Sequence, residues 1–145
     1  LDKHHKEFDA VVVSTADHTH AIATSIALSL GKHVNYEKPL THTVHEARHV
    51  ADLAERKKLA TQMGTQIHAG RNYRRVVEIV QSGALGKVTE VHTWCNKGWH
   101  GGRFSKPQPA PKHLDWDLWL GPAEKRAYSK GVHPANWRRL WDYGV

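Results

Sequence analysis

Short apolar runs and amphipathic segments alternate along the first 66 residues of the chain. The run Asp9–Ser14 is β-branched and apolar without polar alternation, which predicts a strand buried on both faces of a parallel sheet. Residues 21–30 are rich in Ala, Ile and Leu and predict a helix, with Gly31 placed for a left-handed C-terminal cap. The alternation continues with a strand at 33–37, a helix at 44–57 and a strand at 59–66.

The expected helix at 44–57 carries its own start and stop signals. Thr43 and Glu46 form a Thr-x-x-Glu capping box, and Lys57 and Lys58 lie where the helix dipole favours cations. Its apolar stripe is expected to consist of Val44, Ala47, Val50, Ala51 and Ala54.

This order of elements predicts right-handed crossovers and an open parallel α/β sheet. Three strands and two helices make up only half of a doubly wound sheet, and no Gly-rich turn follows any of these strands. If the segment belongs to a dinucleotide-binding domain, it is therefore the second half of one. Ligands of such sheets bind outside the carboxyl ends of the strands, where the loops 14–20, 37–41 and 66–72 are expected to meet. Those loops hold Asp17, His18, His20, Glu37, Lys38, Gln66, His68, Arg71 and Asn72.

The second part of the chain differs in composition. Residues 1–68 carry eight basic and eight acidic side chains, whereas residues 69–145 carry the whole net charge of +7 and all six Trp. We therefore place a domain boundary near residue 68. Beyond it we expect a helix at 73–81 ended by Gly83, a strand at 87–96 and a short helix capped by Asp115. Core packing is favoured over substrate stacking for Trp94, Trp99, Trp137 and Trp141.

Composition also excludes several classes of protein. No run of 18 apolar residues is present, so a membrane partner is not expected, and the single Cys95 excludes a disulfide framework. The chain begins at Leu1 and has one methionine, Met63, which suggests a fragment whose start lies upstream. We expect a cytoplasmic protein, or an exported one if a signal lies in that upstream part.

One short segment resembles a known family. Tyr36–Leu40, with the sequence Tyr-Glu-Lys-Pro-Leu, resembles the Glu-Lys-Pro signature of the glucose-fructose oxidoreductase / inositol dehydrogenase / MocA (Gfo/Idh/MocA) family of nicotinamide-dependent enzymes. The strand ending at Thr15, with His20 after it, is similar to that family's Thr-Pro-Asn-x-x-His strand, although Ala16 and Asp17 replace the Pro and the Asn. Further similar segments are 64–68, 72–78, 82–88, 114–122 and 136–144.

The resemblance implies a fold and a function. Residues 1–68 would be the second half of a Rossmann domain that binds NAD or NADP, and residues 69–145 the beginning of an α+β substrate domain. The activity would be hydride transfer between nicotinamide and a hydroxyl of a sugar or cyclitol. The chain would be the middle of a longer enzyme, inactive alone and homo-oligomeric when whole.

The resemblance also assigns roles to residues, and no metal is among them. Lys38 would be catalytic, because an ammonium beside the hydroxyl can orient it, stabilise alkoxide charge and pass a proton if burial lowers its pKa. The cofactor would be held by Ser14, Thr15, Asp17, His20, Glu37, Lys38, Pro39 and Gln66, although a packed or capping role for His20 is nearly as well supported. The substrate would be held by His68, Asn72, Arg74 and Trp137.

Three other interpretations are less favoured by the residues than this one. His45-Glu46-Ala47-Arg48-His49 matches the zinc-protease pattern H-E-x-x-H, but Glu46 belongs to the capping box and Arg48 is charged where a buried site needs apolar residues. A net charge of +7 with Trp137 beside Arg138 and Arg139 permits a nucleic-acid-binding module, although no nucleic-acid motif is present and we expect no such partner. A family-shaped protein that binds its ligand without turnover is the third.

Overall fold

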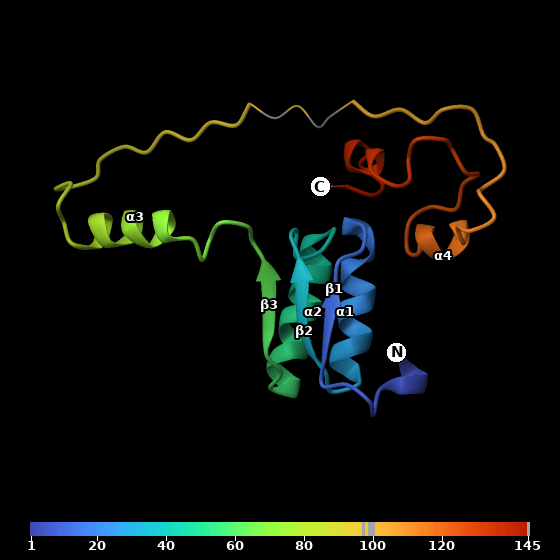
Figure 1. Ribbon diagram of the computed structural model, residues 1–145, viewed down its shortest axis with the longest axis horizontal. Coiled ribbons are helices and arrows are strands. Elements are labelled where there is room, and N and C mark those ends of the chain that lie inside the picture. The colour runs from blue at the N-terminus through green and yellow to red at the C-terminus, as the bar shows by residue number, and fades with distance from the viewer. Residues whose placement is uncertain (97, 99–100, 145) are drawn as a thin grey trace. The chain divides into compact units, whose positions relative to one another are not determined.

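The computed structural model describes residues 1–96, 98 and 101–144, and these form two compact units. The first unit is Leu1–Gly64 with Trp99–Val145, and the second is Thr65–Gly98. The helices and strands of the first unit (Figure 1) are η1 Asp2–His4, β1 Ala10–Val13, η2 Asp17–Thr19, α1 His20–Ser29, β2 His33–Glu37, α2 Val44–Lys57, β3 Thr61–Gly64, α4 Trp116–Leu120 and η3 Asn136–Arg139. The second unit holds α3 Arg71–Gln81.

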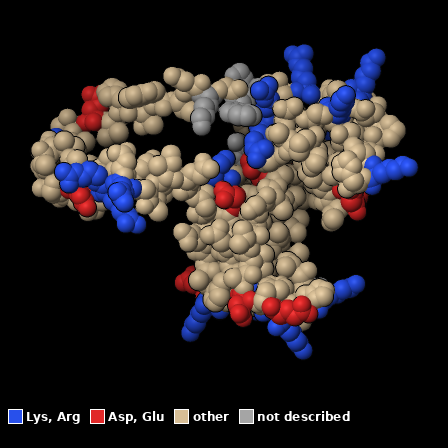
Figure 2. Space-filling view, viewed as in Figure 1, with Lys and Arg blue, Asp and Glu red and all other residues tan. Residues whose placement is uncertain are grey.

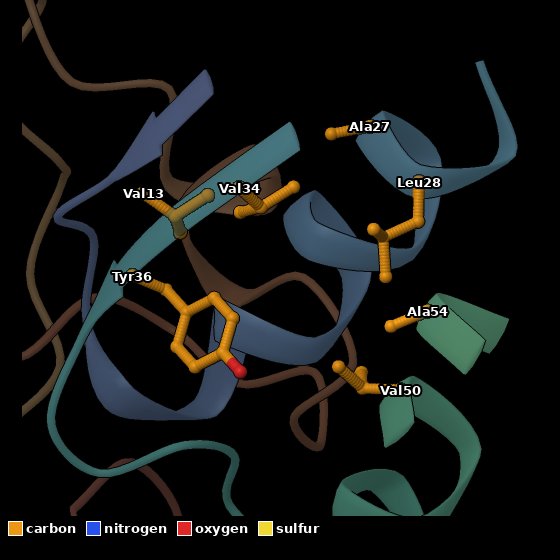
Figure 3. Packing of buried hydrophobic residues seen from close by; sticks show 7 residues of the cluster. All are labelled: Val13, Ala27, Leu28, Val34, Tyr36, Val50 and Ala54. Atoms are coloured by element: carbon orange, nitrogen blue, oxygen red, sulfur yellow. The ribbon is translucent and has the colours of Figure 1, made fainter. Parts of the chain in front are cut away.

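The strands form one parallel sheet in the order β1-β2-β3. Val34 and Tyr36 of β2 are buried on the face that α1 and α2 cover, because alternate residues of a strand point to opposite faces. Figure 3 shows their side chains converging with Leu28 of α1 and Val50 of α2. The parallel α/β sheet expected from the sequence is confirmed.

The expectation that β1 is buried on both faces is wrong. Val13 is buried against the helices, but Val12, which points the other way, is 73% exposed. Its neighbour in register, Asn35, is exposed as well. Both helices pack on the same face of the sheet, so among the described residues nothing covers the other face.

The ends of α1 and α2 follow the sequence signals. Gly31, just after α1, has a left-handed φ of +75°, which a residue without Cβ adopts without strain. At the start of α2 the capping box is complete, because Thr43 Oγ1 accepts from the Glu46 N–H and Glu46 Oε2 accepts from the Thr43 N–H. Both predictions are confirmed.

The predicted apolar stripe of α2 is only partly correct. Val50 and Ala54 are buried and Ala47 is half-buried, but Val44 and Ala51 are exposed. The helix presents a narrower face to the sheet than the stripe predicted, and Val44 in its first turn lies beyond that face.

A second apolar cluster lies in the C-terminal segment of the first unit, residues 101–144. Asp115 caps α4 by accepting from the Leu118 N–H at 2.9 Å, as expected. Trp137 is 4% exposed and packs in the cluster, which confirms core packing. Trp94 and Trp141 are 78% and 87% exposed, so core packing is wrong for them. The expected position of Trp99 lies outside the described residues.

The second unit contains the expected helix but not the expected strand. The helix α3 begins two residues before the predicted start, and Gly83 beyond its end has a φ of +72°. Residues 87–96 do not form a strand. A strand needs a neighbour for its N–H and C=O groups, and no backbone hydrogen bond joins this stretch to another among the residues the structure describes. In the same described part, no helix has the length and apolar character needed to cross a membrane.

Candidate functional site

The loop after β1 combines exposed hydroxyls with buried polar residues. Ser14 and Thr15 are exposed at the carboxyl end of the strand, where ligands of parallel sheets bind. The Thr15 hydroxyl accepts from Thr19 Oγ1 at 2.8 Å, which ties the loop to the start of α1. Asp17 is 8% exposed and begins the short helix η2. This loop can therefore offer the hydroxyls of Ser14 and Thr15 to a ligand.

His20 joins the loop after β1 to the loop after β2. The side chain is fully buried at the first position of α1. Its Nδ1 lies 2.7 Å from the Pro39 carbonyl oxygen and its Nε2 lies 3.0 Å from the Thr15 carbonyl oxygen. Both ring nitrogens are thus occupied by backbone atoms, which favours the packed histidine over a direct cofactor ligand.

Glu37 and Lys38 occupy the carboxyl end of β2, and both side chains are exposed. The Lys38 N–H donates to the Gly64 carbonyl at 3.2 Å. The Glu37 carboxylate lies over Gly64, where a Cβ would come 3.0 Å from Oε1. No ion pair joins Glu37 to Lys38 in the described part of the chain. The described residues do not bury the Lys38 side chain.

A cavity of about 740 Å³ opens beside the loop after β1. Its walls are Ser14 and Thr15, the flank of α1, and parts of the C-terminal segment that include Trp119, Trp137 and Arg138. Most of this lining is apolar, with a few polar groups, which is the usual character of small-molecule sites. Lys38 is not among the residues that line it.

His18 fastens the C-terminal segment to the same loop. It is 1% exposed, its Nε2 donates to the Trp119 carbonyl at 3.0 Å, and its ring lies 4.9 Å from Trp119 and 5.0 Å from Tyr143. Its Nδ1 has no hydrogen-bond partner among the described residues. Burial lowers the pKa of His18, and the nearby His42 lowers it further, against the raising effect of the Trp119 carbonyl.

His42 makes a second attachment of this kind, because its Nε2 lies 2.9 Å from the Trp141 carbonyl oxygen. Sequence reasoning gave neither His18 nor His42 this role. For His18 the only signal was its position in the loop 14–20, and His42 lies one residue beyond the loop 37–41. Gly64 was missed as well, because its pairing with Glu37 depends on the register of β2 and β3, which only the folded sheet shows.

Four predicted site residues belong to the second unit, which is described by itself. Gln66, His68, Asn72 and Arg74 are all exposed. The ring of His68 lies 5.8 Å from that of Tyr73. Their approach to Lys38 remains a prediction.

The zinc-protease pattern on α2 does not have a free general base. His45 and His49 are exposed and line a groove with Ile22 and Ile26 of α1. Glu46 is occupied as the capping residue of the helix, with Oε2 accepting from two backbone N–H groups. No group of three metal-binding side chains occurs in the described ranges.

Comparison with known proteins identifies both parts of the chain. Residues 1–65 match the family model for the NAD-binding Rossmann fold of the Gfo/Idh/MocA oxidoreductases. Residues 69–145 match the model for the C-terminal alpha/beta domain of the same family. The observed parallel sheet is thus the Rossmann part, and a portion of the C-terminal domain follows it.

Individual relatives agree with the family models. An uncharacterized oxidoreductase of Schizosaccharomyces pombe is 34% identical over 125 residues, which are 86% of this chain and 32% of the relative. Inositol 2-dehydrogenase of Salmonella typhimurium is 27% identical over 88 residues, 60% of this chain and 26% of the relative. The crystal structure of apo scyllo-inositol dehydrogenase from Lactobacillus casei matches with a TM-score of 0.54 and 26% identity, covering 59% of this chain and 26% of that one. The chain spans about a third or less of the length of these proteins.

Proposed function

Because this chain belongs to the Gfo/Idh/MocA family of NAD-binding oxidoreductases, we propose that it forms the centre of an enzyme that transfers hydride between NAD or NADP and a hydroxyl of a sugar or cyclitol. The observation that carries the proposal is the position of Glu37-Lys38-Pro39. These residues end β2 at the carboxyl edge of the sheet and are tied through His20 to the loop after β1. Ligands of parallel sheets bind at that edge.

The residues present fit one end of a dinucleotide. Ser14 and Thr15 border the cavity of about 740 Å³, which has room for a nucleoside-sized group. Together with Asp17, Glu37, Pro39 and Gln66 they would hold the cofactor, while His20 would act by supporting the loops. No Gly-rich phosphate-binding turn follows β1, β2 or β3, so the pyrophosphate would be held by other parts of the protein.

Lys38 is the proposed catalytic residue. Oxidation of an alcohol removes a hydride from carbon and a proton from oxygen. A bound nicotinamide supplies the hydride acceptor, which no side chain of this chain can provide. The ammonium of Lys38 would orient the hydroxyl and stabilise negative charge on its oxygen as the proton passes to solvent water. Its exposed side chain is able to reach toward a substrate from a backbone that is held in place.

Substrate contacts and assembly are further parts of the proposal. His68, Asn72 and Arg74 would bind hydroxyl groups from the second unit, and Trp137 would contribute its edge from the wall of the cavity. Residues 1–68 would complete the Rossmann domain of the whole protein and residues 69–145 would open its substrate domain. The relatives that are inositol dehydrogenases support a cyclitol as the first substrate to test. We also propose that the whole protein is a homo-oligomer.

The decisive experiment is a lysine substitution with a matched control. In the protein that contains this chain, Lys38→Met should lower kcat for inositol oxidation about a hundredfold or more, because the cation that stabilises the charge on the substrate oxygen is lost. Lys6→Met changes an exposed lysine before β1. This lysine precedes the amino end of a strand, whereas Lys38 follows the carboxyl end of β2, so the variant should leave kcat unchanged. Turnover is followed by the absorbance of the reduced nicotinamide. Equal kcat values for the two variants would refute the role of Lys38.

The nucleic-acid alternative loses support from the packing of its aromatic residue. Trp137 is buried, and the Arg138 guanidinium lies 4.1 Å from its ring centre, so this ring is not available for base stacking. Figure 2 shows Lys and Arg side chains projecting separately, with carboxylates among them, rather than lining one groove on the face in view. Quenching of Trp fluorescence by NAD or NADP is expected. Binding of an oligonucleotide that weakens steeply with salt, without cofactor binding, would favour the alternative.

A further inference from the structure

The backbone around Lys38 is held from two sides. Its own N–H donates to the Gly64 carbonyl of β3 at 3.2 Å. The carbonyl of the next residue, Pro39, faces Nδ1 of His20 at 2.7 Å. The side chain of Lys38 is exposed, so these backbone contacts fix the position of the Cα atom from which it extends.

His20 is suited to this task by its place in the fold. It is the first residue of α1, and its side chain is fully buried between the loops that follow β1 and β2. A carbonyl oxygen only accepts hydrogen bonds, so the contact with Pro39 requires a ring nitrogen that carries a hydrogen. The opposite nitrogen faces the Thr15 carbonyl at 3.0 Å and fixes the direction of the ring.

We propose that His20 is a positioning residue, whose Nδ1 holds the Pro39 carbonyl and thereby sets the position of Lys38 relative to the loop after β1. This inference rests on the proposed catalytic role of Lys38 and extends it to a residue whose two ring nitrogens both face backbone carbonyls. It also explains why a histidine occupies this position although neither of its ring nitrogens is free to bind a ligand.

Two conservative variants separate hydrogen bonding from packing. In His20→Asn the side-chain amide nitrogen can take the place of Nδ1, which keeps the contact with Pro39 and loses the one with Thr15. In His20→Gln the amide nitrogen matches Nε2 instead, which keeps the contact with Thr15 and loses the one with Pro39. Both variants remove a buried ring, so a role in packing alone predicts similar effects.

The first measurement is hydrogen exchange of the Lys38 backbone amide, followed in the full chain by NMR. We expect exchange close to that of the unchanged protein in His20→Asn and about tenfold faster exchange in His20→Gln, since one buried hydrogen bond is lost near the amide. His33→Gln is the control. The Nδ1 of His33 accepts from the Ala60 N–H at 2.9 Å at the opposite end of β2, and a Gln amide at the position of Nε2 loses this contact, which should leave the Lys38 amide unchanged.

The second measurement is turnover in the protein that contains this chain. His20→Asn should keep most of kcat, whereas His20→Gln should lose about tenfold in kcat with a smaller change in KM, because the catalytic group is misplaced. Equal exchange rates and equal kcat in the Asn and Gln variants would overturn the proposal. If the unchanged protein does not oxidise any cyclitol or sugar, the proposed function fails, while the exchange data still decide whether His20 holds the Lys38 segment.

Discussion

Replacing His18 by Gln separates the hydrogen bond of this buried side chain from its ability to take up a proton. The Gln amide nitrogen can replace Nε2 and continue to donate to the Trp119 carbonyl, which His18 meets at 3.0 Å. Gln does not titrate. The variant therefore keeps the attachment of the C-terminal segment and removes only the effect of pH on it.

The sign of the pH effect follows from burial. Because burial lowers the pKa of His18 in the folded chain below its ordinary value of 6.5, the unfolded chain binds a proton more readily. The free energy of unfolding should be fully retained above pH 6.5 and should fall as the pH drops from 6.5 toward the lower pKa of the folded state. One such group contributes at most about 1.4 kcal/mol for each pH unit within that range.

The assay is chemical denaturation, with the free energy of unfolding measured at several pH values between 7.5 and 5.5 (about two units, chosen around the histidine range). Other histidines also titrate there, so the informative quantity is the difference between the unchanged protein and His18→Gln. We expect that difference to grow in favour of the Gln variant as the pH falls. A constant difference across this range would refute the assignment of the pH effect to His18.

A control variant tests the hydrogen bond itself. His18→Phe keeps a buried ring but leaves the Trp119 carbonyl without its donor, which costs about 1–3 kcal/mol of unfolding free energy. That cost should be present at pH 7.5, where His18→Gln is expected to be close to the unchanged protein. Equal stability of the Phe and Gln variants at this pH (about one unit above the ordinary histidine pKa) would show that the bond contributes nothing.

Two further substitutions test other parts of the first unit. Thr43→Ala removes the acceptor for the Glu46 N–H and should lower the free energy of unfolding by about 1 kcal/mol, measured by denaturation, with an unchanged stability arguing against the capping box. Gly64→Ala places a Cβ 3.0 Å from Glu37 Oε1, so the flexible carboxylate must shift while the stability should change by less than about 1 kcal/mol. If Glu37 binds the cofactor, NAD affinity should fall in this variant. An affinity equal to that of the unchanged protein would refute the proposed contact between Glu37 and the cofactor.

The elements that the sequence predicted well are those with strong local signals. The bounds of β2 and α2 agree with the expected ranges, because β-branched and aromatic residues, Thr43 and Glu46 act within a few residues of each other. The strand expected at 87–96 has the same kind of composition and does not form. A strand depends on a partner, and composition cannot supply one.

In the candidate site, too, local features were predicted from the sequence and contacts between distant segments were not. The sequence indicated that the segment 37–39 would lie at the carboxyl end of a parallel strand, and the structure places it there. It did not indicate that Gly64 would lie beneath Glu37, nor that His18 would be buried against a segment about a hundred residues away. The residues adjacent to His18 and to Trp119 in the sequence give no signal that predicts the contact between the two.

By itself, the sequence determined the order of strands and helices in the first 64 residues, their parallel arrangement and the family signature at Glu37-Lys38-Pro39, because these depend on local patterns and on short connections. Only the tertiary structure decided which face of the sheet is covered, which tryptophans are buried and how His18, His20 and His42 are used. Those outcomes depend on side chains that meet after the chain has folded, and a backbone carbonyl such as that of Pro39 can accept a hydrogen bond from any donor that the fold brings to it.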